Sequence, residues 1–205
     1  MNMIKAMITD TAKRFRDDEH GSMAVEFVLV VPILVWVFLS TYVYFDVYRV
    51  ETNSVRATIT LAEMFSREDV VDNTFIDNAR EVLRELTYEE ANPDVRVTVY
   101  RYQESDDTFR RVWSRHRGYG SVLTNADLTN LASANRLPPM DELEHSIYIE
   151  TRTEYDAPFN IGLGPFILTN LDDVTFTSDM IVRPRDGPRL CFLRNNGTDI
   201  CGPGG

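Results

Sequence analysis

The sequence predicts an α+β protein in which one long apolar helix precedes a domain with an antiparallel sheet and packed helices. Three observations predict it. Residues 27–45 contain no charged side chain, residues 46–65 continue with a helical repeat, and later segments alternate between helix and strand periodicity. We expect a leader-like segment at residues 1–21, a membrane helix at 22–48 and a single exported domain at 49–205.

The apolar run is long enough to cross a membrane once. Its 19 residues from Phe27 to Phe45 rise about 28 Å as a helix, close to the hydrocarbon thickness of about 30 Å. A cleaved secretory signal would have a shorter apolar core and a small-residue cleavage site, whereas Asp46 and Arg49 follow here. A plain signal anchor remains an alternative at this point. The cations Lys13, Arg14 and Arg16 place the N-terminus in the cytoplasm.

Glu26 stands at the N-terminal edge of this run, where hydrophobicity does not explain it. A carboxylate deep in hydrocarbon costs about 2.5 kcal/mol or more, and less near the interface. In a plain anchor the side chain would reach the headgroups. If the chain were cut after Gly21, the α-amino group of Ser22, with a pKa of about 7.7 to 8, could neutralise Glu26 of a neighbour or of the same helix. We also expect the helix dipole to favour this acid in the first turn.

The stretch GSMAVEF from Gly21 to Phe27, followed by Pro32, resembles the start of the transmembrane helix in the TadE/TadG-like family of tight-adherence (Flp) pilus assembly proteins. These are pilin-like proteins of bacterial inner membranes, and TadE members are substrates of a prepilin peptidase. The resemblance implies a processing site at Gly21 and Ser22, and a role in assembly and helix register for Glu26, Phe27 and Pro32. Beyond the apolar run, the chain carries no motif of that family.

The resemblance further implies a single-pass protein with a cytoplasmic N-terminus and a periplasmic domain. Its expected partners are other pilin-like and pilus-assembly proteins, a prepilin peptidase and inner-membrane lipid. One departure is the acidic group Asp17, Asp18 and Glu19 just before Gly21, where the family has a basic leader. The competing interpretation is a membrane-anchored periplasmic binding or sensing module unrelated to pili.

Composition and motifs argue against catalysis and against nucleic acid. The net charge of −11 repels nucleic-acid backbones, so we expect the basic and aromatic stretch 110–117 to pair with acids of the same domain or to face the acidic surface of a partner. The sequence has no nucleophile, phosphate-binding or metal-ligand motif, and its histidines are isolated. We therefore expect no enzyme activity, no cofactor and no metal site, and we expect His145 at the surface.

The exported part is predicted element by element. Val47, Val50, Ser54, Ala57, Leu61 and Phe65 recur at helical spacing, which suits either a pilin-like stem or a helix packed on its own domain. Asp72 or Asn73 caps a second helix that ends near Asn92-Pro93. Residues 95–100 and 109–114 form a hairpin across the turn 104–107. Thr124 and Asp127 open a helix to Asn135, and strands follow at 146–155 and 174–182, joined across 160–165.

The two cysteines, Cys191 and Cys201, lie close to the C-terminus with an Asn196-Gly197 turn between them. A short loop closed by the only two cysteines of an exported domain favours a disulfide over two free thiols. We expect the chain from Pro184 onward to be irregular and held by this bond.

Overall fold

The computed structural model describes residues 22–87, 93–158 and 174–202. The chain divides into two compact units. Of the described residues, one unit comprises 22–45 with 158, and the other comprises 46–87, 93–157 and 174–202. The expected leader at 1–21 and the expected connection at 160–165 lie outside the described residues.

The first described element is helix α2, Ser22–Ser66, which has 45 residues and contains Pro32. Its apolar part belongs to the first unit, and the unit boundary falls between Phe45 and Asp46. Asp46 is the first charged residue after Glu26. The long N-terminal helix and the α+β class are therefore as expected, with an antiparallel sheet and helices following the apolar helix.

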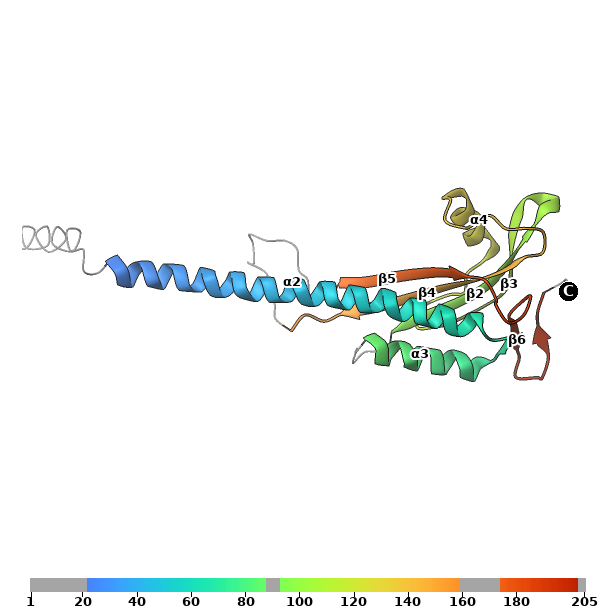
Figure 1. Ribbon diagram of the computed structural model, residues 1–205, viewed down its shortest axis with the longest axis horizontal. Helices are drawn as coiled ribbons and strands as arrows, with labels where there is room; N and C mark the ends of the chain where they lie inside the picture. The colour runs from blue at the N-terminus through green and yellow to red at the C-terminus, as the bar shows by residue number, and fades with distance from the viewer. Residues whose placement is uncertain (1–21, 88–92, 159–173, 203–205) are drawn as a thin grey trace, which may run out of the picture. The chain divides into compact units, whose positions relative to one another are not determined.

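The second unit is built on a four-stranded antiparallel sheet with strand order β3-β2-β4-β5 (Figure 1). Strands β2 (Asp94–Gln103) and β3 (Thr108–Arg117) form the predicted hairpin across a short 3-10 turn at Glu104–Asp106. Strand β4 (His145–Tyr155) pairs with β2, and β5 (Val174–Val182) pairs with β4. The two strands expected at 146–155 and 174–182 are confirmed.

Two further helices begin at capped ends, as the sequence predicts. Helix α3, Asn73–Thr87, starts after Asp72, whose carboxylate accepts the backbone N–H of Phe75 at 2.7 Å. Helix α4, Asn125–Ser133, has Thr124 as its N-cap, and Thr124 and Asp127 form a reciprocal capping box. These bonds satisfy backbone donors that would otherwise have no partner at the helix start.

The sheet buries a different cluster on each face. On one face, α3 and the later part of α2 pack over valines and isoleucines of β2 and β4, in a core that includes Leu61, Phe65, Ile76 and Leu83. On the other face, a smaller cluster surrounds Tyr100 and Tyr148 and includes Leu128 of α4. The alternation of a strand sends neighbouring side chains to opposite faces, which explains why one sheet carries both clusters.

Hydroxyl groups line the contact between α2 and the sheet. We call this set of buried or half-buried residues the hydroxyl seam: Ser54, Thr58, Thr151, Thr153 and Ser178. The hydroxyls of Thr58 and Thr151 lie 2.6 Å apart, and Thr153 donates to Ser54 at 3.1 Å. Thr58 also donates to the Ser54 carbonyl at 2.8 Å, so the buried polar atoms have partners.

The C-terminal segment is more ordered than we expected. Strands β6 (Cys191–Leu193) and β7 (Asp199–Ile200) form a small sheet with β1 (Val70–Val71), which pairs in parallel with β6. The expectation of irregular chain after Pro184 is therefore wrong for these residues. Such short strands carry too few alternating side chains to be detected from a sequence.

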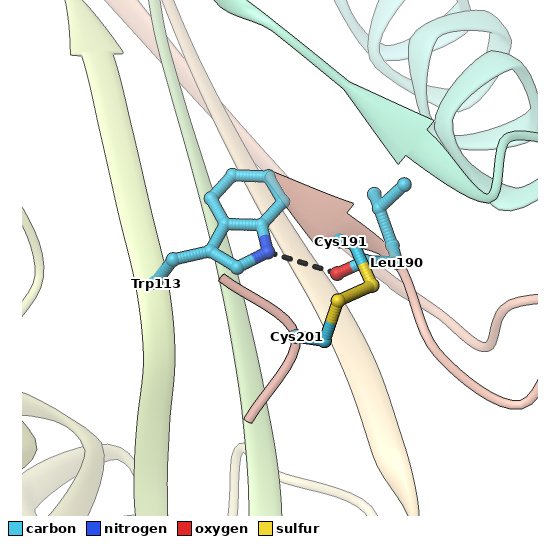
Figure 2. The surroundings of a disulfide bond; sticks show 4 residues. All are labelled: Trp113, Leu190, Cys191 and Cys201. Carbon is cyan, nitrogen blue, oxygen red and sulfur yellow. Dashed lines mark hydrogen bonds between the residues drawn. A yellow bond between two sulfur atoms is a disulfide. The ribbon is translucent and has the colours of Figure 1, made fainter. Parts of the chain in front are cut away.

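The cysteine pair is as expected, because the sulfur atoms of Cys191 and Cys201 lie 2.09 Å apart, the distance of a disulfide bond (Figure 2). The indole N–H of Trp113 donates to the Leu190 carbonyl at 2.9 Å. The Trp113 and Phe192 ring centroids are 5.4 Å apart. The disulfide loop is thus anchored to strand β3 of the main sheet.

The predicted surface position of His145 is wrong. We expected it at the surface, but it is buried at the start of β4. Burial lowers its pKa, and the nearby charges of Arg189 and Arg101 act in the same direction, while a backbone bond at Pro188 opposes them. A histidine next to a glutamate at a strand start gave no signal for burial, because the periodicity of β4 does not determine which face is covered.

Candidate functional site

From Met23 to Val35 helix α2 presents large apolar side chains outward on all sides, whereas Val43 further along the helix is fully buried. Met23, Phe27, Val28, Leu34, Phe38 and Phe45 are all more than half exposed. No residue of its most apolar 18-residue window is buried within the structure. A helix that is apolar all round needs an apolar surrounding. By length and composition, this segment can cross a membrane, and a signal sequence near an N-terminus would meet the same criteria.

Glu26 is the fifth residue of α2 and is exposed. The first turn of the described helix contains no acid, so our expectation that Glu26 lies in that turn is wrong by one residue. The dipole effect falls off beyond the first turn, so it stabilises this carboxylate less than we expected. Ser22 lies one helical step of four residues before Glu26, and Gly21 lies outside the described residues.

Phe27 and Pro32 both project from the exposed surface of α2. Phe27 is 68% exposed. Pro32 lies inside the helix, where it lacks the N–H that would bond to the Val28 carbonyl. The structure therefore brings Ser22, Glu26, Phe27 and Pro32 onto about three turns of one helix, because they share a short stretch of sequence. It brings no second charged group from the described residues to Glu26.

Among the residues that the structure describes, no base, nucleophile or donor lies next to the Glu26 carboxylate to form a reaction centre. The chemistry of this carboxylate is that of recognition, because an acid at the edge of a low-dielectric region gains most from an approaching cation. A cation on another helix, or an ammonium group at a newly formed N-terminus, would satisfy that need.

The domain side of α2 begins with a tether at Asp46. The Tyr155 hydroxyl, at the end of β4, donates to the Asp46 carboxylate at 3.0 Å, and Arg49 donates to the same group at 2.7 Å. This tether and the hydroxyl seam were missed in the sequence. Their only signal was the placement of small hydroxyl residues, rather than large apolar ones, on the inner stripe of α2.

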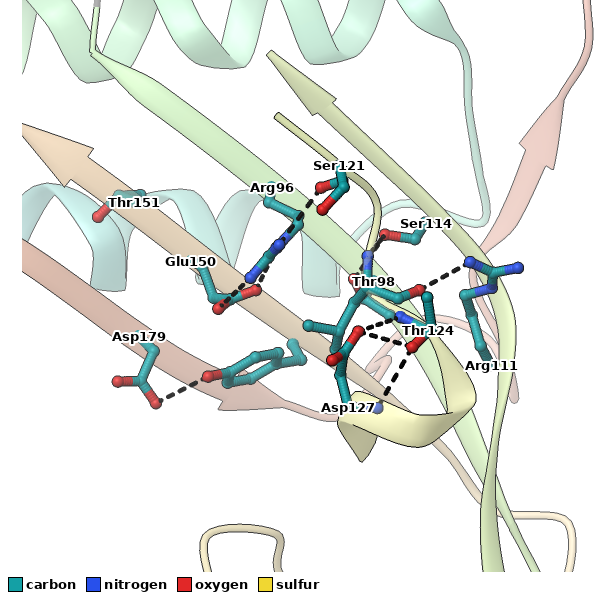
Figure 3. Close-up of polar contacts among 12 residues, drawn as sticks. Arg96, Thr98, Arg111, Ser114, Ser121, Thr124, Asp127, Glu150, Thr151 and Asp179 are labelled. Carbon is teal, nitrogen blue, oxygen red and sulfur yellow. Dashed lines mark hydrogen bonds and ion pairs between the residues drawn. The ribbon is translucent and has the colours of Figure 1, made fainter. Parts of the chain in front are cut away.

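Polar side chains on the α4 face of the sheet form a half-buried, paired network (Figure 3). Arg96 donates to both carboxylate oxygens of Glu150 at 2.6 and 2.7 Å. Arg152 donates to Asp94 at 2.7 Å. The Tyr119 ring lies under both guanidinium groups, at 4.6 and 4.9 Å from centroid to Cζ, and burial raises the pKa of Tyr119 to about 12.

The basic stretch of β3 also finds partners within the domain. Arg110 pairs with Asp106 and Arg117 with Asp77. The Arg111 guanidinium donates to the Leu123 carbonyl at 2.7 Å, and Arg115 lies over the Phe192 ring at 4.2 Å. These contacts leave less of this stretch available to an outside polyanion. Among the described residues, no group of three or more histidines, cysteines or acids is close enough to hold a metal ion.

The comparisons with known proteins identify no relative, since no family model, no curated protein and no solved structure matches this chain.

Proposed function

We propose that this protein is a pilin-like component of a tight-adherence pilus assembly system, inserted in the inner membrane of a bacterium by the apolar part of α2. In this proposal the N-terminus is cytoplasmic and the domain from residue 49 is periplasmic. The observation that carries it is an acid, Glu26, at the edge of an exposed apolar helix, within the stretch GSMAVEF that resembles the TadE/TadG-like family.

The proposed role of Glu26 is to set the register between helices. A carboxylate at the membrane interface pays a smaller penalty than one at the centre, and a partner's cation removes what remains. Cleavage after Gly21 would create an α-amino group at Ser22, mostly protonated at neutral pH. Pairing between that group on one subunit and Glu26 on the next would favour one alignment of two otherwise featureless apolar helices.

The domain supports an exported location. The cysteine pair lies at disulfide distance, and disulfides persist mainly in oxidising compartments such as the bacterial periplasm. In this proposal the chain is a substrate and partner of the assembly machinery and not a catalyst. Its partners are other pilin-like proteins, pilus-assembly proteins, a prepilin peptidase and membrane lipid.

Replacement of Glu26 by glutamine tests the proposal. This change removes the charge and keeps the size, so we expect the bacterium that makes the protein to lose surface pili while the domain still folds. Glu51→Gln is the matched control, because Glu51 is also an exposed acid on α2 but lies beyond the apolar run. Normal piliation and adhesion of the Glu26→Gln strain would contradict the proposal.

The intact mass of the membrane-extracted protein tests processing separately. We expect a chain that has lost Met1 to Gly21 and begins at Ser22. A full-length mass in piliated cells would rule out cleavage and leave pairing of Glu26 with some other cation. A full-length mass together with normal adhesion of Glu26→Gln would favour the membrane-anchored binding module instead.

A further inference from the structure

A cavity on the α4 side of the sheet is lined by no residue of helix α2. It has a volume of about 640 Å³ and lies between the segment that follows α4 and the ends of β4 and β5. Ligand sites for small molecules commonly measure about 300 to 1,000 Å³. Its lining falls entirely within the second unit.

The lining of the cavity combines apolar and polar side chains. Leu137, Pro138, Pro139 and Ile181 supply the apolar surface. Ser146, at the start of β4, lines the cavity, is fully buried, and its hydroxyl has no hydrogen-bond partner among the described residues. A buried hydroxyl without a partner costs free energy that a bound acceptor would recover.

A second hydroxyl lies beside the first. Tyr100 of β2 stands opposite Ser146 in the β2–β4 pairing and is fully buried, but it is not part of the cavity lining. Burial raises the pKa of Tyr100 to about 12, and a side-chain interaction with Ser146 only partly offsets this. Tyr100 therefore keeps its proton at neutral pH and can contact Ser146, but not a ligand in the cavity.

Two arginines flank the opening. Arg136 donates to Asp179 at 2.8 Å, and Arg183 pairs with Glu144 at 2.8 Å and donates to the Pro139 carbonyl at 3.3 Å. These bonds hold both guanidinium groups at the rim and engage only some of the five N–H donors that each carries. Both side chains are about half exposed, so the remaining donors can reach a ligand.

From this combination we infer that the cavity binds a carboxylate carried on a small apolar group. Arg136, Arg183 and Ser146 offer N–H and O–H donors, which suit an anionic acceptor and disfavour a cation. The apolar walls suit an aliphatic side chain and not a fully hydrated anion such as phosphate. The free C-terminus of a peptide and a small aliphatic acid share this chemistry.

The inference is tested on the full chain in detergent micelles with paired probes. N-acetyl-leucine represents a peptide terminus and isovalerate a small acid, and each is compared with its neutral amide. Binding is followed by NMR through the methyl resonances of Ile181. We expect saturable shifts with at least one acid and binding about tenfold weaker or worse with its amide, because charge-assisted hydrogen bonds are lost. Tighter binding of one acid identifies the source of the carboxylate.

Three variants locate the site. Arg136→Gln and Arg183→Gln should each weaken binding of the acid about tenfold, and Ser146→Ala several-fold. Arg110→Gln is the matched control, because Arg110 is a similarly exposed, acid-paired arginine at the β2–β3 hairpin, and its binding should equal that of the wild type. Equal binding of acid and amide, no saturable shift at 10 mM probe, or equal loss in Arg110→Gln would overturn the inference.

Discussion

The two parts of helix α2 share one backbone conformation and differ in everything that surrounds it. From Phe27 to Phe45 most of the large apolar side chains are exposed, with Val43 fully buried and Trp36 and Leu39 half-buried. From Asp46 to Ser66 it buries one stripe, which includes Ser54, Thr58, Leu61 and Phe65, against its own domain. The unit boundary falls between these two parts.

The difference shows that helix formation and helix environment are decided by different features of the sequence. Helical spacing continues through both parts, but only the later part has polar residues on its outer side and small or hydroxyl residues on its inner side. Small inner residues allow a close approach to the strands, and the hydroxyls bond to one another across the contact. The earlier part exposes most of its large apolar side chains, which suits contact with lipid or another apolar partner.

Truncation of a buried aromatic should separate the two parts most strongly. Phe65 is fully buried and its ring centroid lies 5.1 Å from that of Phe75. Phe65→Ala should lower the free energy of unfolding by about 3–5 kcal/mol, through lost burial and the cavity that remains. Guanidinium unfolding, followed by Trp113 fluorescence in a Trp36→Phe background, measures it.

The matched control is Phe38→Ala, because Phe38 is 71% exposed in the apolar part. It should change the unfolding free energy of the domain by no more than about 0.5 kcal/mol. Equal destabilisation by the two variants would contradict the separation of α2 into a packed part and an apolar part.

The disulfide comes next in expected size. Cys191 and Cys201 are separated by 10 residues in sequence, and the chain entropy of such a loop corresponds to about 2–3 kcal/mol. The double replacement Cys191→Ser with Cys201→Ser should reduce domain stability by that amount and leave membrane insertion unchanged. If a reductant destabilised the double variant further, the effect would not come from this bond.

Substitutions at Thr58 and Thr151 in the hydroxyl seam should change the free energy of unfolding non-additively. Thr58→Val and Thr151→Val should each cost about 1 kcal/mol, because each leaves a buried hydroxyl short of a partner. The double variant should cost less than the sum of the two, since no orphaned partner then remains. Thr60→Val controls for the helix itself, because Thr60 makes the same type of bond to the Arg56 carbonyl but is exposed. If the double variant lost as much stability as the two single variants together, Thr58 and Thr151 would not interact across the seam.

The smallest effect concerns pH and His145. Its folded-state pKa is lowered by burial, whereas the unfolded chain titrates near 6.5. The stability that this group contributes is therefore fully present above about pH 6.5 and decreases as pH falls through the lowered folded-state pKa. Unfolding curves between pH 7 and pH 5 should show this loss in the wild type and a flatter profile in His145→Asn. If the wild type and His145→Asn lost stability equally between pH 7 and pH 5, the loss would come from the titration of other groups.

Much of the fold follows from local patterns. The capping box of Thr124 and Asp127, the Asp72 cap and the alternation of valines in β2 each act within a few residues, so the sequence alone predicts them. The apolar run and its single acid are equally local. By contrast, the parallel pairing of Val70 and Val71 with β6 joins segments more than a hundred residues apart. Its strands are too short to carry a pattern.

The same distinction explains the residues that sequence analysis missed. Thr58 and Thr151 are 93 residues apart, and neither has a neighbour in sequence that reveals the contact. The cavity at Ser146 likewise depends on Arg136 and Arg183, which follow α4 and β5 and lie far apart in the sequence. The sequence stripe on α2 allowed both a free stem and a packed helix, and only the tertiary contacts decide for the packed helix over residues 54–65.

The most direct test of the account is protease digestion of spheroplasts followed by intact-mass analysis of the membrane-protected fragment. We predict that the domain beyond about residue 48 is removed and that the protected fragment begins at Ser22 and contains the apolar run. A domain that stays protected until the membrane is opened, or a chain released intact by alkaline washing, would contradict a membrane-spanning α2 with an exported domain.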